Sequence, residues 1–181
     1  MTPTADELNR LSKVTYPDTK TTQYTYDWRY NVIDTTDQAL RTTHNVYDAA
    51  GRLTSVTTAY GTPDAATTAY TYYNDGRKQT ETDPLGPTHT TTYNYDPAGR
   101  LTSTVDAQTH TTTYAYDDAG NHISVTDPNN HKTQQQYDAR RRLAKTTYDD
   151  AATTQYTYDG PGNLATVTDQ AGKVVQYTEL Q

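Results

Sequence analysis

The sequence of 181 residues contains no cysteine and no phenylalanine, and it is poor in aliphatic side chains, with nine Leu, nine Val and two Ile. Without cysteine the chain forms no disulfide and offers no thiolate to a metal, and the redox compartment is left open. So few aliphatic residues, together with a net charge of −7 and a mean hydropathy of −1.01, argue against a conventional hydrophobic core. This balance is typical of disordered chains.

Two abundant residue types argue against disorder. The chain has 40 Thr and 18 Tyr, and both favour strands, whereas disordered segments are poor in aromatic and β-branched side chains. The composition therefore predicts a β-sheet that is wet on both faces, in which Tyr supplies most of the buried area.

Basic residues are few and mostly scattered. The 15 Lys and Arg cluster only at Arg140, Arg141 and Arg142, so the electrostatic footprint of a nucleic-acid-binding protein is missing. No apolar run approaches membrane-spanning length, and the start, MTPTADELNRL, has no apolar signal region. We expect no nucleic-acid partner and no membrane insertion, and any export signal lies outside this sequence.

The chain is built from tandem repeats. The segments DAAGRLTSVT, DPAGRLTSTV, DDAGNHISVT and DGPGNLATVT are copies of one motif. They belong to a single array of eight units, and most units end in T-x-Y-x-Y. The predicted units are 6–26, 27–47, 48–72, 73–95, 96–116, 117–137, 138–158 and 159–181. The structural markers of the repeat are Tyr47, Asp48, Gly51, Arg52, Tyr70, Tyr72, Tyr93, Tyr95, Asp96, Gly99, Arg100, Tyr114, Tyr116, Asp117, Gly120, Tyr137, Asp138, Tyr156, Tyr158, Asp159 and Gly162.

The paired tyrosines predict strands. Two Tyr at i and i+2 share one face of a strand, whereas on a helix they lie about 200° apart. No unit shows a helical apolar pattern. Leu53 and Val56 differ in parity, so either both faces are partly wet or a β-bulge near the turn re-aims Leu53. The predicted fold class is all-β, with tandem antiparallel hairpins that form a curled or spiralling sheet.

Each unit contains two turns. Asp96-Pro97-Ala98-Gly99 has the residues of a type I turn, and its Gly supplies the left-handed residue of a G1 bulge. Asn9, Tyr30 and Arg141 replace this Gly, and Pro161 takes a disfavoured position, so these four turns are the weakest part of the assignment. A second turn is marked by Asp37, Asp83, Asp106, Asp127 and Asp169.

Two units are longer than the rest. They carry four and two extra residues, which we assign to the second loop at Tyr60-Gly61-Thr62-Pro63 and Gly86-Pro87. Even insertions lengthen a hairpin by whole cross-strand pairs, so the face that carries Tyr is not reversed.

The repeat resembles a known family. The pattern Y-D-x-x-G-R-L-T-S-V-T followed by T-x-Y-x-Y-D is similar to the YD repeat of the RHS-repeat proteins, which include bacterial polymorphic toxins, the shell subunits of Tc toxins and the teneurins. Its best copies run from Tyr47 to Tyr72, from Tyr95 to Tyr116 and from Tyr116 to Tyr137. The resemblance implies a spiralling sheet that closes into a hollow shell, a toxic or effector domain inside it, and secretion or a cell-surface location. The closing region with a self-cleaving aspartate site is absent here, which indicates a fragment of about eight repeats or a short array with its own role.

The predicted sheet is wide and has open edges. Eight units give about 16 strands, and open twisted sheets rarely exceed about ten strands without curling. Stacked Tyr rings supply the packing. The first and last units, with Ala5 and Val175 where a Tyr is expected, leave strand edges exposed. We expect these edges to pair with flanking YD repeats or with copies of the chain.

No catalytic, cofactor-binding or metal-ligating residue is predicted. The serines are repeat residues outside any G-x-S-x-G motif, and the turn aspartates recur with the turn, as a catalytic pair would not. Of five His, only His110 and His131 are equivalent, one 21-residue interval apart, and exposed side chains are favoured over a metal pair. The serines are Ser12, Ser55, Ser103 and Ser124, and the other histidines are His44, His89 and His122.

Three functions remain open. The first is a non-catalytic segment of a shell that encloses or displays a toxin, effector or other domain. The second is an extracellular carbohydrate-binding or adhesion module, since Tyr rings beside Asp and Asn are the side chains of sugar-binding surfaces. The third is a self-assembling repeat protein.

Overall fold

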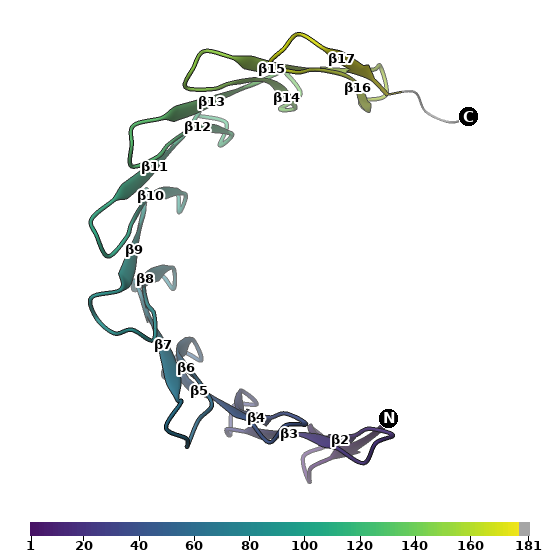
Figure 1. Ribbon diagram of the computed structural model, residues 1–181, viewed down its shortest axis with the longest axis vertical. Coiled ribbons are helices and arrows are strands. Elements are labelled where there is room, and N and C mark those ends of the chain that lie inside the picture. The colour runs from purple at the N-terminus through teal and green to yellow at the C-terminus, as the bar shows by residue number, and fades with distance from the viewer. Residues whose placement is uncertain (178–181) are drawn as a thin grey trace. The chain divides into compact units, whose positions relative to one another are not determined.

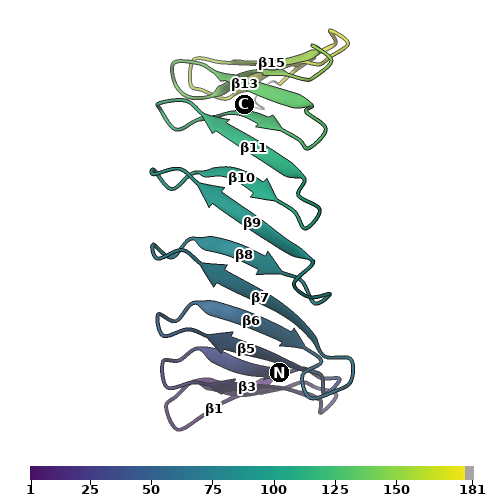
Figure 2. The ribbon, with the colours of Figure 1, turned by 90° about the vertical axis from the view of Figure 1, so that its left-hand side faces the viewer.

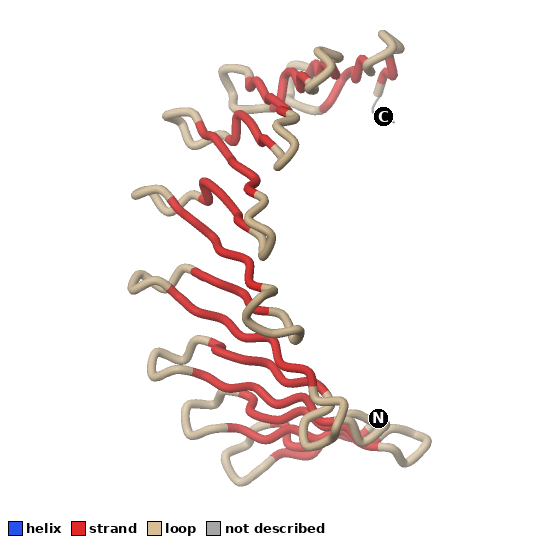
Figure 3. The backbone as a smooth tube through the Cα atoms, turned by 60° about the vertical axis from the view of Figure 1, so that its left-hand side comes forward, coloured by secondary structure: helices blue, strands red, loops and turns tan. Residues whose placement is uncertain are grey.

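The computed structural model describes residues 1–177, and over that range it contains strands and turns but no helix (Figure 3). All its strand pairings are antiparallel and join strands that follow one another in sequence. The predicted all-β class, with tandem antiparallel hairpins, is confirmed. The structure has 17 strands rather than 16, because the strand Thr2–Ala5 precedes the first predicted unit. The division into eight units remains a prediction.

The strands fall into two compact halves, Met1–Thr92 and Tyr93–Gln181. The boundary lies inside β9 (Thr90–Tyr95). The N-terminal half contains β1 (Thr2–Ala5), β2 (Leu11–Thr15), β3 (Thr21–Tyr26), β4 (Val32–Thr36), β5 (Thr42–Tyr47), β6 (Leu53–Thr58), β7 (Ala66–Tyr72) and β8 (Lys78–Thr82). The C-terminal half contains β10 (Leu101–Val105), β11 (Thr111–Tyr116), β12 (His122–Thr126), β13 (Lys132–Tyr137), β14 (Leu143–Thr147), β15 (Thr153–Tyr158), β16 (Leu164–Thr168) and β17 (Val174–Gln176).

Each half is a single curved layer. Within a half the strands lie side by side in chain order, with turns along both edges (Figure 2). Their direction changes progressively from one hairpin to the next (Figure 1). The curling predicted for a wide twisted sheet is therefore present inside each half.

A β-bulge in each unit brings the apolar residues onto the face that carries the tyrosines. Between β5 and β6, Asn45 pairs with Val56, the register then shifts, and Tyr47 pairs with Leu53. Because directly paired residues lie on the same face, the skipped residue puts Leu53 and Val56 on one side with Tyr47. The bulge is therefore the correct one of the two alternatives for Leu53. We call this side the tyrosine face.

The opposite side is a threonine face. Cross-strand hydroxyl pairs lie 2.7 Å apart at Thr71–Thr80 and 2.8 Å apart at Thr57–Thr67. Thr25 and His44 both contact Asp34 on this face, at 2.9 Å and 2.7 Å. Such pairs stabilise a sheet without burying apolar surface.

Neither half has a conventional core. Val14 is the one buried hydrophobic residue of the described chain, with 8% of its surface exposed. The other buried residues there are Ser124, Thr146 and Thr154. Most strand residues of both faces are half-buried. The sheet therefore depends on contacts between adjacent strands, as the lack of aliphatic residues requires.

The turns have the predicted geometry, including those without glycine. Gly51, Gly99 and Gly120 have φ of 80°, 87° and 86°, in the left-handed region. Asn9 and Arg141 take the same conformation, with φ of 59° and 62°. The turn with Pro161 also closes, through a hydrogen bond from the Gly162 N–H to the Asp159 carbonyl. The second turns have the same form without glycine at Thr19, Leu40, Thr109, Asn130 and Ala151.

The two insertions are accommodated differently. The four-residue insertion adds one cross-strand pair, Thr58–Ala66, to the β6–β7 ladder and leaves the rest in the loop. The two-residue insertion adds no pair to the β8–β9 ladder, which ends at Thr82–Thr90. The register of the tyrosine face is preserved in both.

The turn geometry generates a stability prediction. We expect Gly120→Ala to lower the free energy of unfolding by about 1–2 kcal/mol, because alanine is disfavoured in the left-handed region, and the added methyl group contacts nothing within 4 Å. Gly160→Ala is the matched control, since Gly160 has equal space but lacks a left-handed φ. Urea unfolding followed by circular dichroism measures both variants. If both variants lose the same free energy of unfolding, the left-handed φ of Gly120 is not the cause of the loss.

Candidate functional site: the turn aspartates and the clamps between hairpins

An aspartate that opens a main turn caps it. The Oδ1 atom of Asp48 accepts backbone N–H bonds from Ala50 and Arg52, both at 2.9 Å. Its Oδ2 atom accepts the Nε of Arg52 at 2.7 Å. One carboxylate therefore satisfies three donors, which explains why the motif begins with Asp. The same arrangement recurs at Asp6–Arg10, Asp96–Arg100 and Asp138–Arg142.

Asparagine takes the place of this arginine in three turns. The side-chain amides of Asn31 and Asn121 donate to Asp27 and Asp117, each at 2.8 Å. Asn163 donates to Asp159 at 3.3 Å. An amide closes the turn equally well, but it is too short to reach the next hairpin.

Three turns begin with Tyr in place of Asp, and an aspartate two residues later replaces the cap. Asp75 accepts the backbone N–H of Arg77 at 3.0 Å, and Asp150 accepts that of Ala152 at 3.0 Å. Asp18 accepts the N–H of Lys20 at 3.3 Å. The requirement is thus for a carboxylate near the turn rather than for a particular position.

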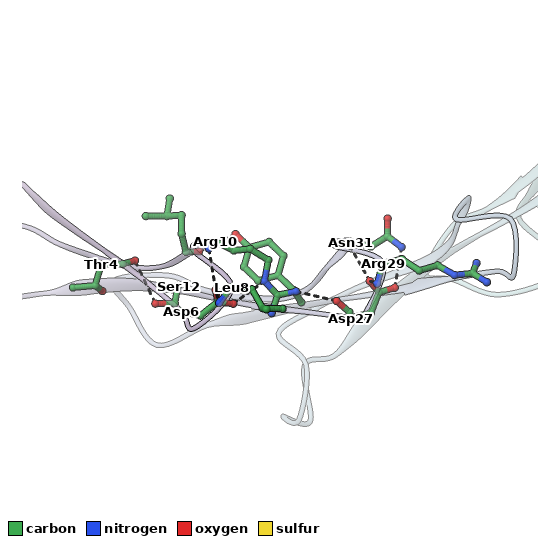
Figure 4. A network of polar contacts seen from close by, with 10 residues as sticks. Thr4, Asp6, Leu8, Arg10, Ser12, Asp27, Arg29 and Asn31 are labelled. Atoms are coloured by element: carbon green, nitrogen blue, oxygen red, sulfur yellow. Dashed lines mark hydrogen bonds and ion pairs between the residues drawn. The ribbon is translucent and has the colours of Figure 1, made fainter.

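The arginine of the main turn also contacts the following hairpin. Arg10 binds its own Asp6, and its Nη1 donates to the carbonyl of Asp27 at 3.0 Å (Figure 4). Its guanidinium lies 4.7 Å from the ring centroid of Tyr26. Arg52 and Arg100 repeat both contacts, with Nη1 bonds of 3.1 Å and 3.0 Å. Since the carboxylate already orients the guanidinium, the contact with the ring costs little further ordering.

The last arginine of this series keeps only part of the contact. Arg142 lies 4.2 Å from the ring centroid of Tyr158 and pairs with Asp138. Its Nη1 atom is buried and has no hydrogen-bond partner. The following turn differs in sequence, Asp159-Gly160-Pro161-Gly162, and a shallow hollow of about 410 Å³ adjoins this arginine.

The tyrosine before the aspartate contacts the preceding hairpin. The hydroxyl of Tyr47 donates to the carbonyl of Val32 at 3.1 Å, and that of Tyr158 donates to Leu143 at 2.9 Å. Tyr26, Tyr72 and Tyr137 make the equivalent bond. This ring and hydroxyl, together with the arginine of the preceding turn, form what we call the clamp between two hairpins.

The turn carboxylates are stabilised in their charged form. The backbone N–H of Arg52, followed by its guanidinium, holds the pKa of Asp48 below its ordinary value. The equivalent groups of Arg142 lower the pKa of Asp138. Hydrogen bonds to a carboxylate favour ionisation because they are lost on protonation.

The structure spreads the candidate catalytic and metal-binding residues along the sheet. Ser55, Ser103 and Ser124 lie in strands on the threonine face. His110 and His131 each contact the aspartate of their own turn, at 3.0 Å and 3.1 Å. Residues 1–177 contain no group of three or more His, Asp or Glu that could hold a metal.

Sequence reasoning missed three features. The sequence pattern marks the arginines as repeat residues but does not indicate their contacts between hairpins. His122 occupies a leucine position on the tyrosine face, where Nδ1 lies 2.9 Å from Oε1 of Gln135. Val175 pairs with Val167, and in the preceding unit the equivalent pair is Thr154 with Thr146. Val175 is therefore the counterpart of Thr154, and the expectation of a Tyr at residue 175 is wrong. Tyr177 takes the tyrosine position instead.

Comparison with known proteins places these features in a family. The family description RHS Repeat matches residues 72–111, 95–121 and 116–153. No curated protein matches the chain in sequence. Within the part that the structure describes, no helix has the length and apolar character needed to cross a membrane.

Several solved toxin structures contain the same fold. A Photorhabdus luminescens Tc holotoxin pore with a TccC3 mutation superposes with a TM-score of 0.71 at 22% identity, over 84% of this chain and 9% of that one. TcdB2-TccC3 without its hypervariable C-terminal region gives 0.75 at 18% identity, over 91% and 11%. TcdB2-TccC3-Cdc42 gives 0.72 at 22% identity, over 96% and 10%. The chain thus spans about a tenth of the chains that it resembles.

The fold and the clamps define a class of protein: a tandem array of antiparallel β-hairpins in which tyrosine hydroxyls and, at several turns, arginines join neighbouring hairpins. Within that class, residues 72–153 of this chain match the RHS Repeat description, and the array has the fold of the Tc toxin structures.

The clamp predicts an energetic coupling between hairpins. We expect Arg100→Ala and Tyr116→Ala to couple by about 0.5–1 kcal/mol in a double-mutant cycle, because each removes the same cation–π contact, whose guanidinium lies 4.9 Å from the ring centroid. Urea unfolding of the two single variants and the double variant measures this energy. The pair Arg41 and Tyr116 serves as a control in which no coupling is expected. Strict additivity for Arg100 and Tyr116 would contradict the clamp.

The lowered pKa values predict sensitivity to acid. A carboxylate with a depressed folded-state pKa contributes stability that is complete above its unfolded-state pKa of about 3.9 and is lost as the pH falls through the folded-state value. We therefore expect the unfolding midpoint in urea to be constant near neutral pH and to fall below about pH 4. Asp48→Asn should be less stable at pH 7 and should lose less stability on acidification. An identical pH profile for wild type and variant would contradict this role for Asp48.

Proposed function

We propose that this array is a non-catalytic wall segment of a shell that encloses or displays another domain. The observation that carries the proposal is the fastening of each hairpin to its neighbours alone, through turn and tyrosine clamps, in a layer without a core. Such a layer extends by adding hairpins and needs no second layer behind it. In the family that the repeats resemble, arrays of this kind close into hollow shells.

The polar character of both faces supports a wall that is wet on two sides. The threonine face is held by hydroxyl pairs, and the tyrosine face is held by half-buried rings. The hollow of about 410 Å³ beside Arg142 is lined by turn and strand residues that include Asp138 and Tyr158. These groups are already engaged in the fold, so we infer that the chemistry of the whole protein belongs to other segments. Secretion or display at the cell surface is the location consistent with this function.

A carbohydrate-binding surface on the tyrosine ladders is the alternative. A sugar bound there would need the phenol hydroxyls as partners, but those of Tyr47, Tyr137 and Tyr158 already donate to backbone carbonyls. Their engagement favours packing over adhesion for these rings.

A graft into a related shell tests the proposal. We would replace the superposing stretch of TcdB2-TccC3 by this chain and measure whether the segment inside the assembly resists added protease. A wall segment should preserve the resistance. The control graft carries another stretch of TcdB2-TccC3's own repeats at the same place. If the control is protected and a folded graft of this chain is not, the proposal is wrong.

The open edges generate a separate prediction about assembly. Among the described residues β1 pairs with β2 and β17 pairs with β16, and Val174 and Val175 of β17 are 52% and 45% exposed. Unpaired apolar strand edges associate, so we expect concentration-dependent dimers or larger species by sedimentation velocity. Val174→Lys should reduce them, whereas Val46→Lys, on an interior strand, should not. A monomer at every concentration would contradict this prediction.

A further inference from the structure

Comparison of the equivalent main turns shows which side chains a turn needs in order to form. At the two positions after the opening residue, three main turns carry only Ala, Gly or Pro, namely Ala49-Ala50, Pro97-Ala98 and Gly160-Pro161. The turn between β3 and β4 carries Trp28 and Arg29, followed by Tyr30 at the glycine position. Arg140 occupies the position of Arg29 and makes the equivalent contact, with its Nη1 donating to the carbonyl of Gly160 at 3.3 Å. Trp28 and Tyr30 have no aromatic counterpart in the other main turns, so these two rings need another explanation.

The backbone of this turn is strained by its sequence. Tyr30 has a φ of 69°, in the left-handed region where the equivalent positions of five turns have glycine. A bulky side chain is uncommon in that conformation, and strained residues concentrate at functional sites. Tyr30 is also 61% exposed, so burial does not compensate for the strain.

The exposed ring of Trp28 is supported from behind. Trp28 is 80% exposed. The guanidinium of Arg29 lies 4.4 Å from the centroid of the indole, and its Nη1 donates to the carbonyl of Ala49 in the next turn. Arg29 extends away from Arg10, toward that turn (Figure 4). On the other side, Arg10 lies 5.2 Å from the ring centroid of Tyr30.

The charge of the tip indicates the chemistry of its ligand. Arg29 is exposed and forms no ion pair with any carboxylate in residues 1–177. Its guanidinium has further N–H donors in the planar arrangement that matches a carboxylate. Arg29 therefore presents an exposed cation beside the indole of Trp28, in a chain whose net charge is −7.

We propose that Trp28, Arg29 and Tyr30 form a binding site for an acidic peptide segment of a partner protein. Trp, Arg and Tyr are the residue types enriched in the hot spots of protein interfaces, and rigid anchors lose little entropy on binding. The rings of Trp28 and Tyr30 cover an apolar side chain of the partner, and Arg29 takes a neighbouring carboxylate. This site is independent of the proposed wall function.

The test compares the whole chain with a variant that has the turn sequence of its own repeat. Trp28→Ala, Arg29→Ala and Tyr30→Gly together convert the turn to the Ala-Ala-Gly of residues 49–51. A library of displayed 12-residue peptides is selected on the wild-type chain and depleted on this variant. We expect the surviving peptides to carry Asp or Glu beside Leu, Ile or Phe.

One such peptide is then synthesised and titrated. Trp28 is the single tryptophan of the chain, so its fluorescence reports binding directly. Labelled-peptide anisotropy should show at least about tenfold weaker binding for Trp28→Ala. Arg29→Gln should weaken binding and reduce its dependence on salt. Leu85→Ala changes an exposed turn residue elsewhere and should leave affinity unchanged.

Several results would overturn the proposal. Loss of thermal stability in the triple variant would mean that the three side chains serve the fold. Survival of no peptide, or of peptides without acidic residues, would exclude the proposed ligand. A neutral oligosaccharide that displaces the peptide would point to a sugar platform, and a Trp28 signal that depends on protein concentration alone would point to a second copy of the chain.

Discussion

A sheet one layer thick has no interior in which to bury side chains, so each hairpin of this protein must be stabilised by the two beside it. The turn aspartate makes this feasible. By accepting two backbone N–H groups and the side chain four residues later, Asp48 sets both the turn and the position of Arg52. Because the guanidinium is already oriented, its contact with the following hairpin costs little further side-chain entropy. The turn and the contact of Arg52 with the following hairpin both depend on this carboxylate.

The clamps explain how a chain with 20 Leu, Val and Ile residues folds at all. Tyrosine contributes apolar area along its ring and ends in a hydroxyl, so it packs on a half-wet surface and still satisfies a backbone carbonyl of the preceding hairpin. Arginine does the same in the opposite direction, with its stem on the sheet and its charge paired. Each clamp is weak alone, and repetition along the sheet makes their sum substantial. The proposed peptide site depends on what the repeat does not use, since the ring of Trp28 has no aromatic counterpart in the other main turns.

Local chemistry made much of the fold predictable. Alternating Tyr and Thr, with Asp and Gly at regular intervals, specify strands and turns through contacts only a few residues apart. The turns at Asn9 and Arg141 keep the same left-handed conformation as the glycine turns, with φ of 59° and 62°. The contact between Arg100 and the carbonyl of Asp117 was not predicted, since it spans 17 residues and depends on how two hairpins are aligned.

By itself, the sequence determined the all-β class, the repeat, the two turns per unit and the resemblance to RHS repeats, because each is encoded in short-range patterns. The tertiary structure decided which face of the sheet Leu53 occupies. A single bulged residue moves the following side chains to the opposite face, and no local sequence pattern shows whether the bulge forms. It also decided the partners of the arginines and the exposure of Trp28. Those properties depend on register between hairpins, where the contacting atoms come from units about 20 residues apart in the chain.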